Sequence, residues 1–210
     1  MRKLMIATLI SAGTLFSTAA LAADKITSFT LDPTHTQVVF SWNHFGFASP
    51  SAIFKDIQGE ILANETTPEK SSVTVSIKVD SLETGVPLLN EHLLTQPENY
   101  FKVAQHPTIT FKSTGIRNVD REDQEFDLVG TLTINGISKE VVLETEVNKI
   151  GEHPMWNNAR ALGLSAETTF KRSDFGMGMY APAVSDELDV KITLEAIETK
   201  AYKAALAAQK

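Results

Sequence analysis

The chain of 210 residues contains no cysteine. This absence excludes disulfide bonds, thiolate nucleophiles and metal sites built on thiolates. It also excludes a lipid anchor attached to a cysteine at a cleavage point. Any chemistry or binding that the protein performs therefore has to use other side chains.

Basic residues are also scarce. The chain has 19 Lys and Arg against 26 Asp and Glu, for a formal net charge of −7. The excess of acid grows by two when Arg2 and Lys3 are removed with the segment described next. Nucleic acids and anionic membrane surfaces bind clustered positive charge. The charge balance therefore predicts no nucleic-acid partner.

Long apolar runs are confined to the start of the chain. Arg2 and Lys3 precede an apolar run from Leu4 to Phe16, and Ala20-Leu21-Ala22 follows. This order is typical of a cleaved secretory signal, and the run is shorter than the roughly 20 residues that span a bilayer. We expect residues 1–22 to be a signal peptide, and residues 23–210 to form one periplasmic domain without stable membrane insertion.

Catalytic and metal-binding motifs are missing as well. The five histidines form no His-x-x-x-His pair, and there is no Gly-x-Ser-x-Gly nucleophile motif. His35 and His44 could converge at neighbouring strand ends, but isolated histidines bonded in turns are the better default. The sequence predicts no metal, no cofactor and no enzyme activity.

Amphipathic strands dominate the rest of the chain. Apolar and polar residues alternate with a period of two, which indicates half-buried strands. The alternation covers Gln37–His44, Ser72–Asp80, Thr108–Ser113, Phe126–Ile134, Ala161–Lys171 and Asp186–Ala196. Asn135-Gly136 predicts a tight hairpin turn into Ser138–Val147, since both residues tolerate positive φ. Helical spacing is limited to Val86–Leu94 and to Ala201–Lys210, which is either a terminal helix or a frayed tail.

Eight or more such strands in one domain predict an all-β antiparallel fold. A closed barrel removes exposed strand edges, but a sandwich fits the periodicity equally well. The alternation also leaves open whether the interior is filled by side chains or holds a ligand.

The segment Arg172–Ser185 is long for a hairpin loop. It combines glycines with Met177, Met179 and Tyr180. Flexible methionines beside aromatic rings suit an adaptable lid or pocket mouth, whereas the alternative is a loop that seals a filled core.

Several motifs together resemble the YceI-like family, and the resemblance runs from about Ile26 to Ala196. The motifs, in order, are Asp32–Phe40 (DPTHTQVVF) with His44, Glu91–Leu93 (EHL), Asn99–Phe101 (NYF), His106–Ser113 (HPTITFKS), Gly130–Lys139 (GTLTINGISK), Arg172–Met177 (RSDFGM) and Ser185–Leu188 (SDEL).

The resemblance implies a single elongated, lipocalin-like antiparallel β-barrel with one or two short helices, usually periplasmic. It implies a long internal pocket for an isoprenoid lipid, of the quinone or prenyl-phosphate type, or for another long-chain amphiphile. It also implies no enzyme activity and no metal. The oligomeric state stays open, with a homodimer among the options.

A closed barrel turns one face of every strand inward, and these faces supply the candidate cavity residues. They are Phe40, Trp42, Val75, Ile77, Phe111, Leu132, Leu164, Phe170 and Ile192. At the pocket mouth we expect Arg172 to hold a polar head group, with Tyr180 donating a hydrogen bond and Met177 and Met179 covering the first part of the chain.

Three alternatives stay open. Arg172 could instead brace its loop by pairing with Asp174 or Asp186. The protein could be a lipid-acting hydrolase or isomerase with His44 or His92 as the base. It could also be a stress-response or electron-transport accessory module with a filled core.

Overall fold

The computed structural model describes residues 25–208. The predicted signal peptide 1–22 and its cleavage point lie outside the described residues.

The described residues form a closed antiparallel β-barrel of eight strands. The ring runs in the order β1, β4, β5, β7, β8, β9, β10, β11, and it closes where Leu31 of β1 pairs with Ala196 of β11. The strands are β1 (Ile26–Leu31), β4 (Ile57–Asn64), β5 (Ser72–Lys78), β7 (Thr108–Asp120), β8 (Glu125–Ile134), β9 (Ile137–His153), β10 (Ala159–Lys171) and β11 (Glu187–Glu198). The predicted barrel is therefore confirmed, and the sandwich alternative is excluded.

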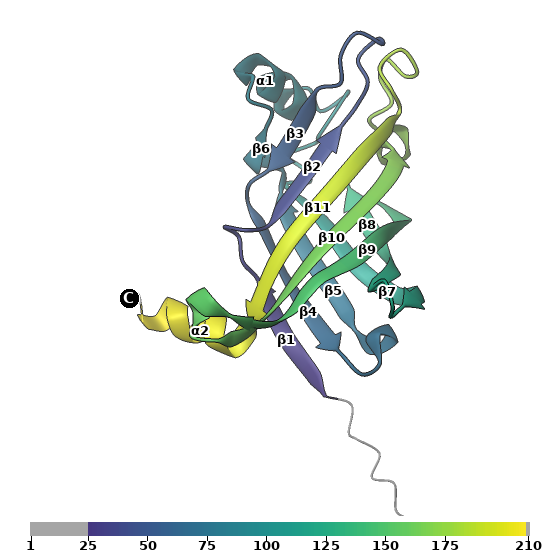
Figure 1. Cartoon of the computed structure of the whole chain (residues 1–210). Helices are drawn as coiled ribbons and strands as arrows, with labels where there is room; N and C mark the ends of the chain where they lie inside the picture. Colours follow the sequence, from purple (N-terminus) through teal and green to yellow (C-terminus); the bar gives the residue numbers. More distant parts are fainter. Residues whose placement is uncertain (1–24, 209–210) are drawn as a thin grey trace, which may run out of the picture.

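Three shorter strands extend one end of the ring. The strand β2 (Gln37–Ser41) pairs with the first half of β11, β3 (Ser51–Phe54) pairs with β2, and β6 (Leu82–Glu83) pairs with β3. Because the second half of β11 pairs with β1, this one strand joins both parts of the wall (Figure 1).

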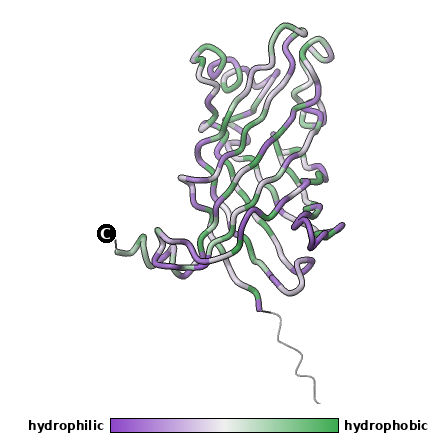
Figure 2. Tube along the Cα trace, viewed as in Figure 1, coloured by the Kyte–Doolittle hydropathy of each residue, from purple (hydrophilic) through white to green (hydrophobic). Residues whose placement is uncertain are grey.

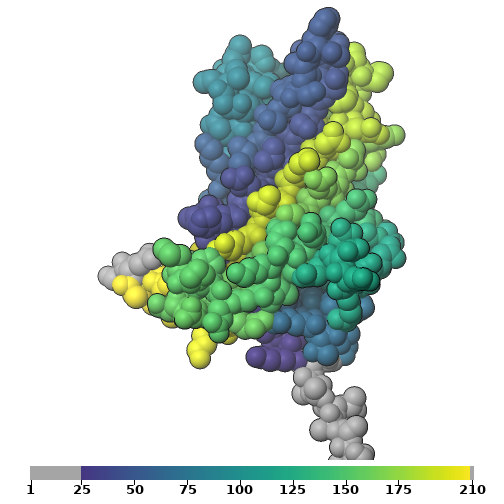
Figure 3. Space-filling model, in the orientation of Figure 1, coloured from purple at the N-terminus to yellow at the C-terminus, as the bar shows by residue number. Residues whose placement is uncertain are grey.

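Two helices lie at the ends of the barrel. The helix α1 (Pro87–Thr95) stands at the upper end in Figure 1, and α2 (Thr199–Ala208) follows β11 at the lower end. Short 3₁₀ turns occur at η1 (Pro68–Lys70), η2 (Val79–Ser81), η3 (Pro154–Trp156) and η4 (Arg172–Phe175). The outer end of the β9–β10 hairpin projects beside α2 (Figure 3). The rings of Trp156 and Tyr202 stack there, with their centroids 5.5 Å apart.

The Asn135-Gly136 turn joins β8 to β9 as the sequence predicts. Asn135 has a φ of 52° and Gly136 a φ of 76°, which is the left-handed pair that a tight primed turn needs. The ring of His106 covers this turn, so that a Cβ on Gly136 would lie 2.5 Å from it.

The observed strands differ from the predicted ones where the alternation is broken. The strand β7 continues to Asp120, beyond its predicted end at Ser113. A register shift between Ser113 and Gly115 interrupts the alternation, so the sequence pattern does not indicate the second half of the strand. The short strand β1 was not predicted, because its buried face includes Thr27 while the exposed Ile26 is apolar. The alternation of hydrophobic and hydrophilic residues is visible along the long strands in Figure 2.

Candidate binding cavity

An apolar cavity of about 130 Å³ lies inside the barrel. Strands from the whole ring contribute to its wall, since one face of each strand points inward. Three threonines, Thr36, Thr145 and Thr168, belong to the wall, and every other lining residue is apolar. No His, Asp, Glu, Lys, Arg or Tyr belongs to the lining of this cavity.

Seven of the nine predicted cavity residues line this space. They are Val75, Ile77, Phe111, Leu132, Leu164, Phe170 and Ile192. The other two, Phe40 and Trp42, line a separate pocket at the upper end. Sequence reasoning left out Leu31 and Phe54, which also line the cavity, because their strands are short and carry weak alternation.

A layer of aromatic rings separates the cavity from the upper pocket. Phe54 lines the cavity, whereas Phe40 and Phe101 line the upper pocket. The ring of Phe54 lies 5.6 Å from that of Phe40 and 5.9 Å from that of Phe101, between centroids. All three side chains are buried, and contacts of this kind stabilise a packed cluster. The two spaces share no lining residue.

The upper end of the barrel consists of segment 42–50, α1 and segment 172–186. Its pocket has a volume of about 310 Å³ and includes the four predicted mouth residues, Arg172, Met177, Met179 and Tyr180. It also includes His44 and His92. Exposed apolar side chains gather in these segments and at the N-cap of α1: Phe45, Phe47, Val86, Leu88, Met179 and Tyr180.

The guanidinium of Arg172 is buried and binds its own loop. Its Nε donates to Ser185 O at 2.8 Å, its Nη2 donates to Val184 O at 3.0 Å, and its Nη1 donates to Met177 O. Burial lowers the pKa of Arg172 from its usual value, and the nearby carboxylate of Asp186 opposes that change. This geometry favours the role of a loop brace, although through carbonyls rather than the predicted carboxylates. The predicted head-group role of Arg172 stays a prediction.

The lower end of the barrel includes segment 64–71 and the turn 120–125, in addition to α2. A second pocket of about 280 Å³ opens here, and Val73 and Leu164 line both this pocket and the central cavity. The cavity therefore adjoins the lower pocket directly. Asn64, Arg121 and Gln124 are among the polar residues of its rim.

The comparisons with known proteins agree with this architecture. The model of the YceI-like domain matches residues 29–196. The chain belongs to the YceI-like family. Protein YceI of Salmonella arizonae is 31% identical over 189 residues, which cover 90% of this chain and 95% of that protein.

Solved structures share the barrel. The YceI protein of Campylobacter jejuni matches with a TM-score of 0.63 and 29% identity, over 70% of this chain and 84% of that chain. A polyisoprenoid-binding domain from Saccharophagus degradans matches with a TM-score of 0.59, over 82% of this chain and 99% of that one. Its identity is 14%, so this second likeness shows the fold alone.

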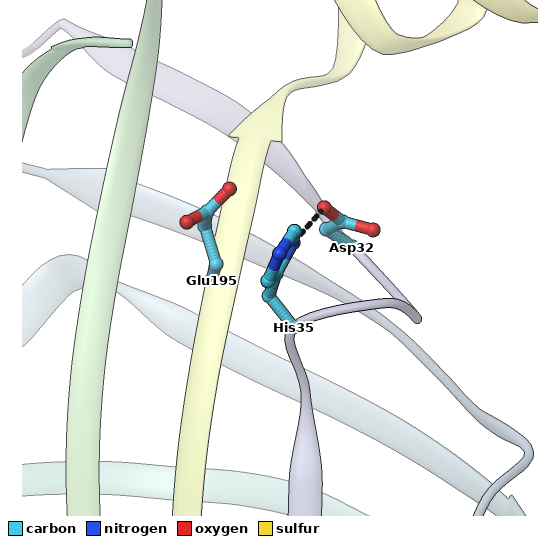
Figure 4. A group of neighbouring side chains, drawn as sticks. All are labelled: Asp32, His35 and Glu195. Carbon is cyan, nitrogen blue, oxygen red and sulfur yellow. Dashed lines mark hydrogen bonds and ion pairs between the residues drawn. The ribbon is translucent and has the colours of Figure 1, made fainter. Parts of the chain in front are cut away.

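The first YceI-like motif of the chain forms a polar cluster on the outside of the barrel. The Nδ1 of His35 lies 2.8 Å from Oδ2 of Asp32, and Oδ1 of Asp32 accepts from the N–H of Thr34 at 2.9 Å (Figure 4). Glu195 of β11 lies next to the pair, and its Oε1 is 3.2 Å from Nε2 of His153. His35 therefore lies near Asp32 and Glu195, and does not converge with His44, whose backbone forms isolated β-bridges with Ala48 and Val184 at the upper end.

The electrostatics of this pair are those of a hydrogen-bonded turn. Burial of Asp32 acts to raise its pKa, but hydrogen bonds from His35 and Thr34 outweigh burial and lower it. The hydrogen bond to Asp32 raises the pKa of His35. The two bonds together hold the connection between β1 and β2.

No helix among residues 25–208 combines the length and the apolar character needed to cross a membrane.

Proposed function

We propose that the protein is a periplasmic carrier or sequestering protein for a long apolar amphiphile, and that its cargo is an isoprenoid lipid. The observation that carries the proposal is the central cavity, which is lined by apolar residues and three threonines. The polyisoprenoid-binding domain of Saccharophagus degradans, with the same fold, supports this choice of ligand class.

The size of the cavity limits what it holds at one time. An engineered apolar cavity of about 150 Å³ accommodates benzene, so 130 Å³ fits about one isoprenoid unit. A longer chain must continue into a neighbouring space, and the lower pocket adjoins the cavity at Val73 and Leu164. Burial of ten methylene groups contributes about 8 kcal/mol of transfer free energy, which corresponds to micromolar affinity before ordering costs.

Catalysis inside the barrel has little support. A hydrolase or isomerase needs a positioned acid or base near the reacting bond, and none lines the central cavity. His44 and His92, the candidate bases, line the upper pocket beyond the aromatic layer. Binding without chemistry is therefore the role that we propose.

Native mass spectrometry of the protein exported by its own host tests the proposal. We expect an added mass that organic solvent removes and that matches an isoprenoid lipid. Protein without extractable cargo, which also fails to bind added isoprenoids, would support the accessory module with a filled core.

A cavity-filling variant provides the specific control. Ala166 lines the cavity, whereas its neighbour Glu167 lies on the exposed outer face of β10. We expect Ala166→Phe to abolish most of the bound lipid, because the added ring occupies the space of one isoprenoid unit. Glu167→Phe adds the same ring outside the barrel and should leave the bound lipid unchanged.

A further inference from the structure

The lower end of the barrel contains a buried polar group without a partner. Asn64 is 1% exposed, and its Nδ2 makes no hydrogen bond to any described residue. Buried amide hydrogens are almost always satisfied in folded proteins, so each exception calls for a physical reason. Asn64 lines the lower pocket that adjoins the central cavity.

The orientation of the Asn64 amide is fixed by its other atoms. Its Oδ1 accepts from the backbone N–H of Thr66 at 3.1 Å and of Thr67 at 2.8 Å. A flipped amide would place its NH₂ group against these two donors, so the oxygen has to face them. The backbone N–H of Asn64 donates to Ser71 Oγ at 2.9 Å, which holds the residue at the end of β4. The unpartnered Nδ2 is thus a donor held in a fixed place.

The charges around the pocket select the kind of acceptor. Glu65, Asp120 and Glu125 line it, and Arg121 is the one basic residue in that lining. Arg121 already donates through Nη2 to Thr66 O at 3.2 Å. Glu65 is paired with Arg160, whose Nη2 lies 2.6 Å and 2.7 Å from its two carboxylate oxygens. An anionic head group would still meet the carboxylates of Asp120 and Glu125, whereas an uncharged carbonyl oxygen meets no such repulsion.

The remainder of the lower pocket suits the apolar chain that leads to such a head group. Ile61, Phe126, Leu162 and Val147 contribute to its wall, next to the shared residues of the central cavity. The upper pocket offers no comparable continuity, because the aromatic layer intervenes.

We propose that the lower pocket binds the head group of the cargo, that this head group is an uncharged carbonyl, and that Nδ2 of Asn64 donates the hydrogen bond to it. The proposal rests on the proposed carrier function and narrows its ligand class, because a prenyl phosphate would be disfavoured at this end.

Three probes with the same farnesyl chain test the proposal on the mature protein: farnesylacetone, farnesyl diphosphate and farnesene. We expect farnesylacetone to bind more tightly than farnesyl diphosphate. Asn64→Asp retains the oxygen that accepts from Thr66 and Thr67 but removes the free NH₂ group. It should weaken binding of farnesylacetone about tenfold and leave farnesene within about twofold, the scale of one lost hydrogen bond.

The matched control is Asn148→Asp. Asn148 is exposed on the outside of the barrel, where its Nδ2 donates to Ser165 Oγ. The Asn148→Asp variant introduces the same charge and should leave the affinities of all three probes unchanged.

A second measurement uses the wild-type protein and so does not depend on the folding of the variant. The infrared carbonyl band of bound farnesylacetone should lie at lower frequency than in a hydrocarbon solvent, because the carbonyl accepts a hydrogen bond. An unshifted band, tighter binding of the diphosphate, or equal binding of farnesylacetone to wild type and Asn64→Asp would each overturn the head-group assignment while the carrier function stands. Failure of all three probes to bind would overturn the carrier function and this inference together.

Discussion

The two ends of the barrel carry similar polar groups but use them differently. At the upper end, Arg172 and Asn135 are buried, and their donors are bound to backbone carbonyls of the loops. At the lower end, Asn64 is equally buried, yet its Nδ2 has no described partner. The comparison teaches that a charged or amide side chain near a pocket is a candidate ligand only when its donors are not already used by the fold.

The largest expected effect follows from removing the brace at the upper end. Arg172→Met would leave the carbonyls of Met177, Val184 and Ser185 without their charged donor. We expect the free energy of unfolding to fall by about 3 kcal/mol, measured by denaturant titration. The affinity for farnesylacetone should not change. A loss of affinity with unchanged stability would instead identify Arg172 as the head-group residue and reverse the assignment of the two ends.

The second prediction compares the two buried asparagines. Nδ2 of Asn135 donates to Tyr100 O at 3.0 Å and to Phe175 O at 3.2 Å, so Asn135→Asp places a carboxylate against two carbonyls. We expect a loss of about 2–3 kcal/mol in the free energy of unfolding. Asn64→Asp also buries a carboxylate, but it breaks no donor bond within the protein, and the carboxylate still accepts from the N–H groups of Thr66 and Thr67. Its loss should therefore be smaller than that of Asn135→Asp. Equal losses in urea denaturation would show that Nδ2 of Asn64 is bonded in solution.

The third prediction concerns the strands β7 and β8 in the barrel wall, between the two ends. A Cβ on Gly130 would lie 2.3 Å from the ring of Phe111, which lines the cavity. We expect Gly130→Ala to force this ring aside, to lower the free energy of unfolding by about 1–3 kcal/mol and to weaken lipid binding. Gly115 on the adjacent strand has open space around its Cβ position, so Gly115→Ala is the control. Thermal melts that show the same shift for both variants would contradict the close packing at Gly130.

The smallest expected effect concerns pH at the Asp32–His35 pair. The raised pKa of His35 means that the folded state holds this proton more tightly than the unfolded chain does. The stabilisation is therefore fully present below the unfolded value of about 6.5 and is lost as the pH rises through the folded pKa. The pKa of Asp32 is lowered, so this partner stays ionised throughout that range.

The test compares wild type with His35→Gln. The difference in their free energies of unfolding should be larger at pH 5.5 than at pH 8.5, and small at both values because His35 is solvent-exposed. A difference that does not change with pH would show that Asp32 does not raise the pKa of His35.

Much of the barrel was predictable from local pattern. The alternation in β5 and β8 and the turn residues Asn135 and Gly136 encode a half-buried antiparallel strand and a tight hairpin directly. The same alternation placed Ile77 and Ile192 correctly on the inward face. The periodicity alone did not decide between a barrel and a sandwich. The resemblance to the YceI-like family implied that the ring of strands is closed.

The sequence by itself determined the strand faces, the acidic charge and the absence of thiol chemistry, because each depends on residue type and spacing. Only the tertiary structure decided that Phe40 and Trp42 lie beyond an aromatic layer, that the donors of Arg172 bind loop carbonyls, and that Nδ2 of Asn64 has no described partner. These are contacts between segments far apart in the chain, and their geometry depends on how the ring closes. The type of a residue gives the number of its hydrogen-bond donors and acceptors, but the fold decides which of them are already bonded within the protein.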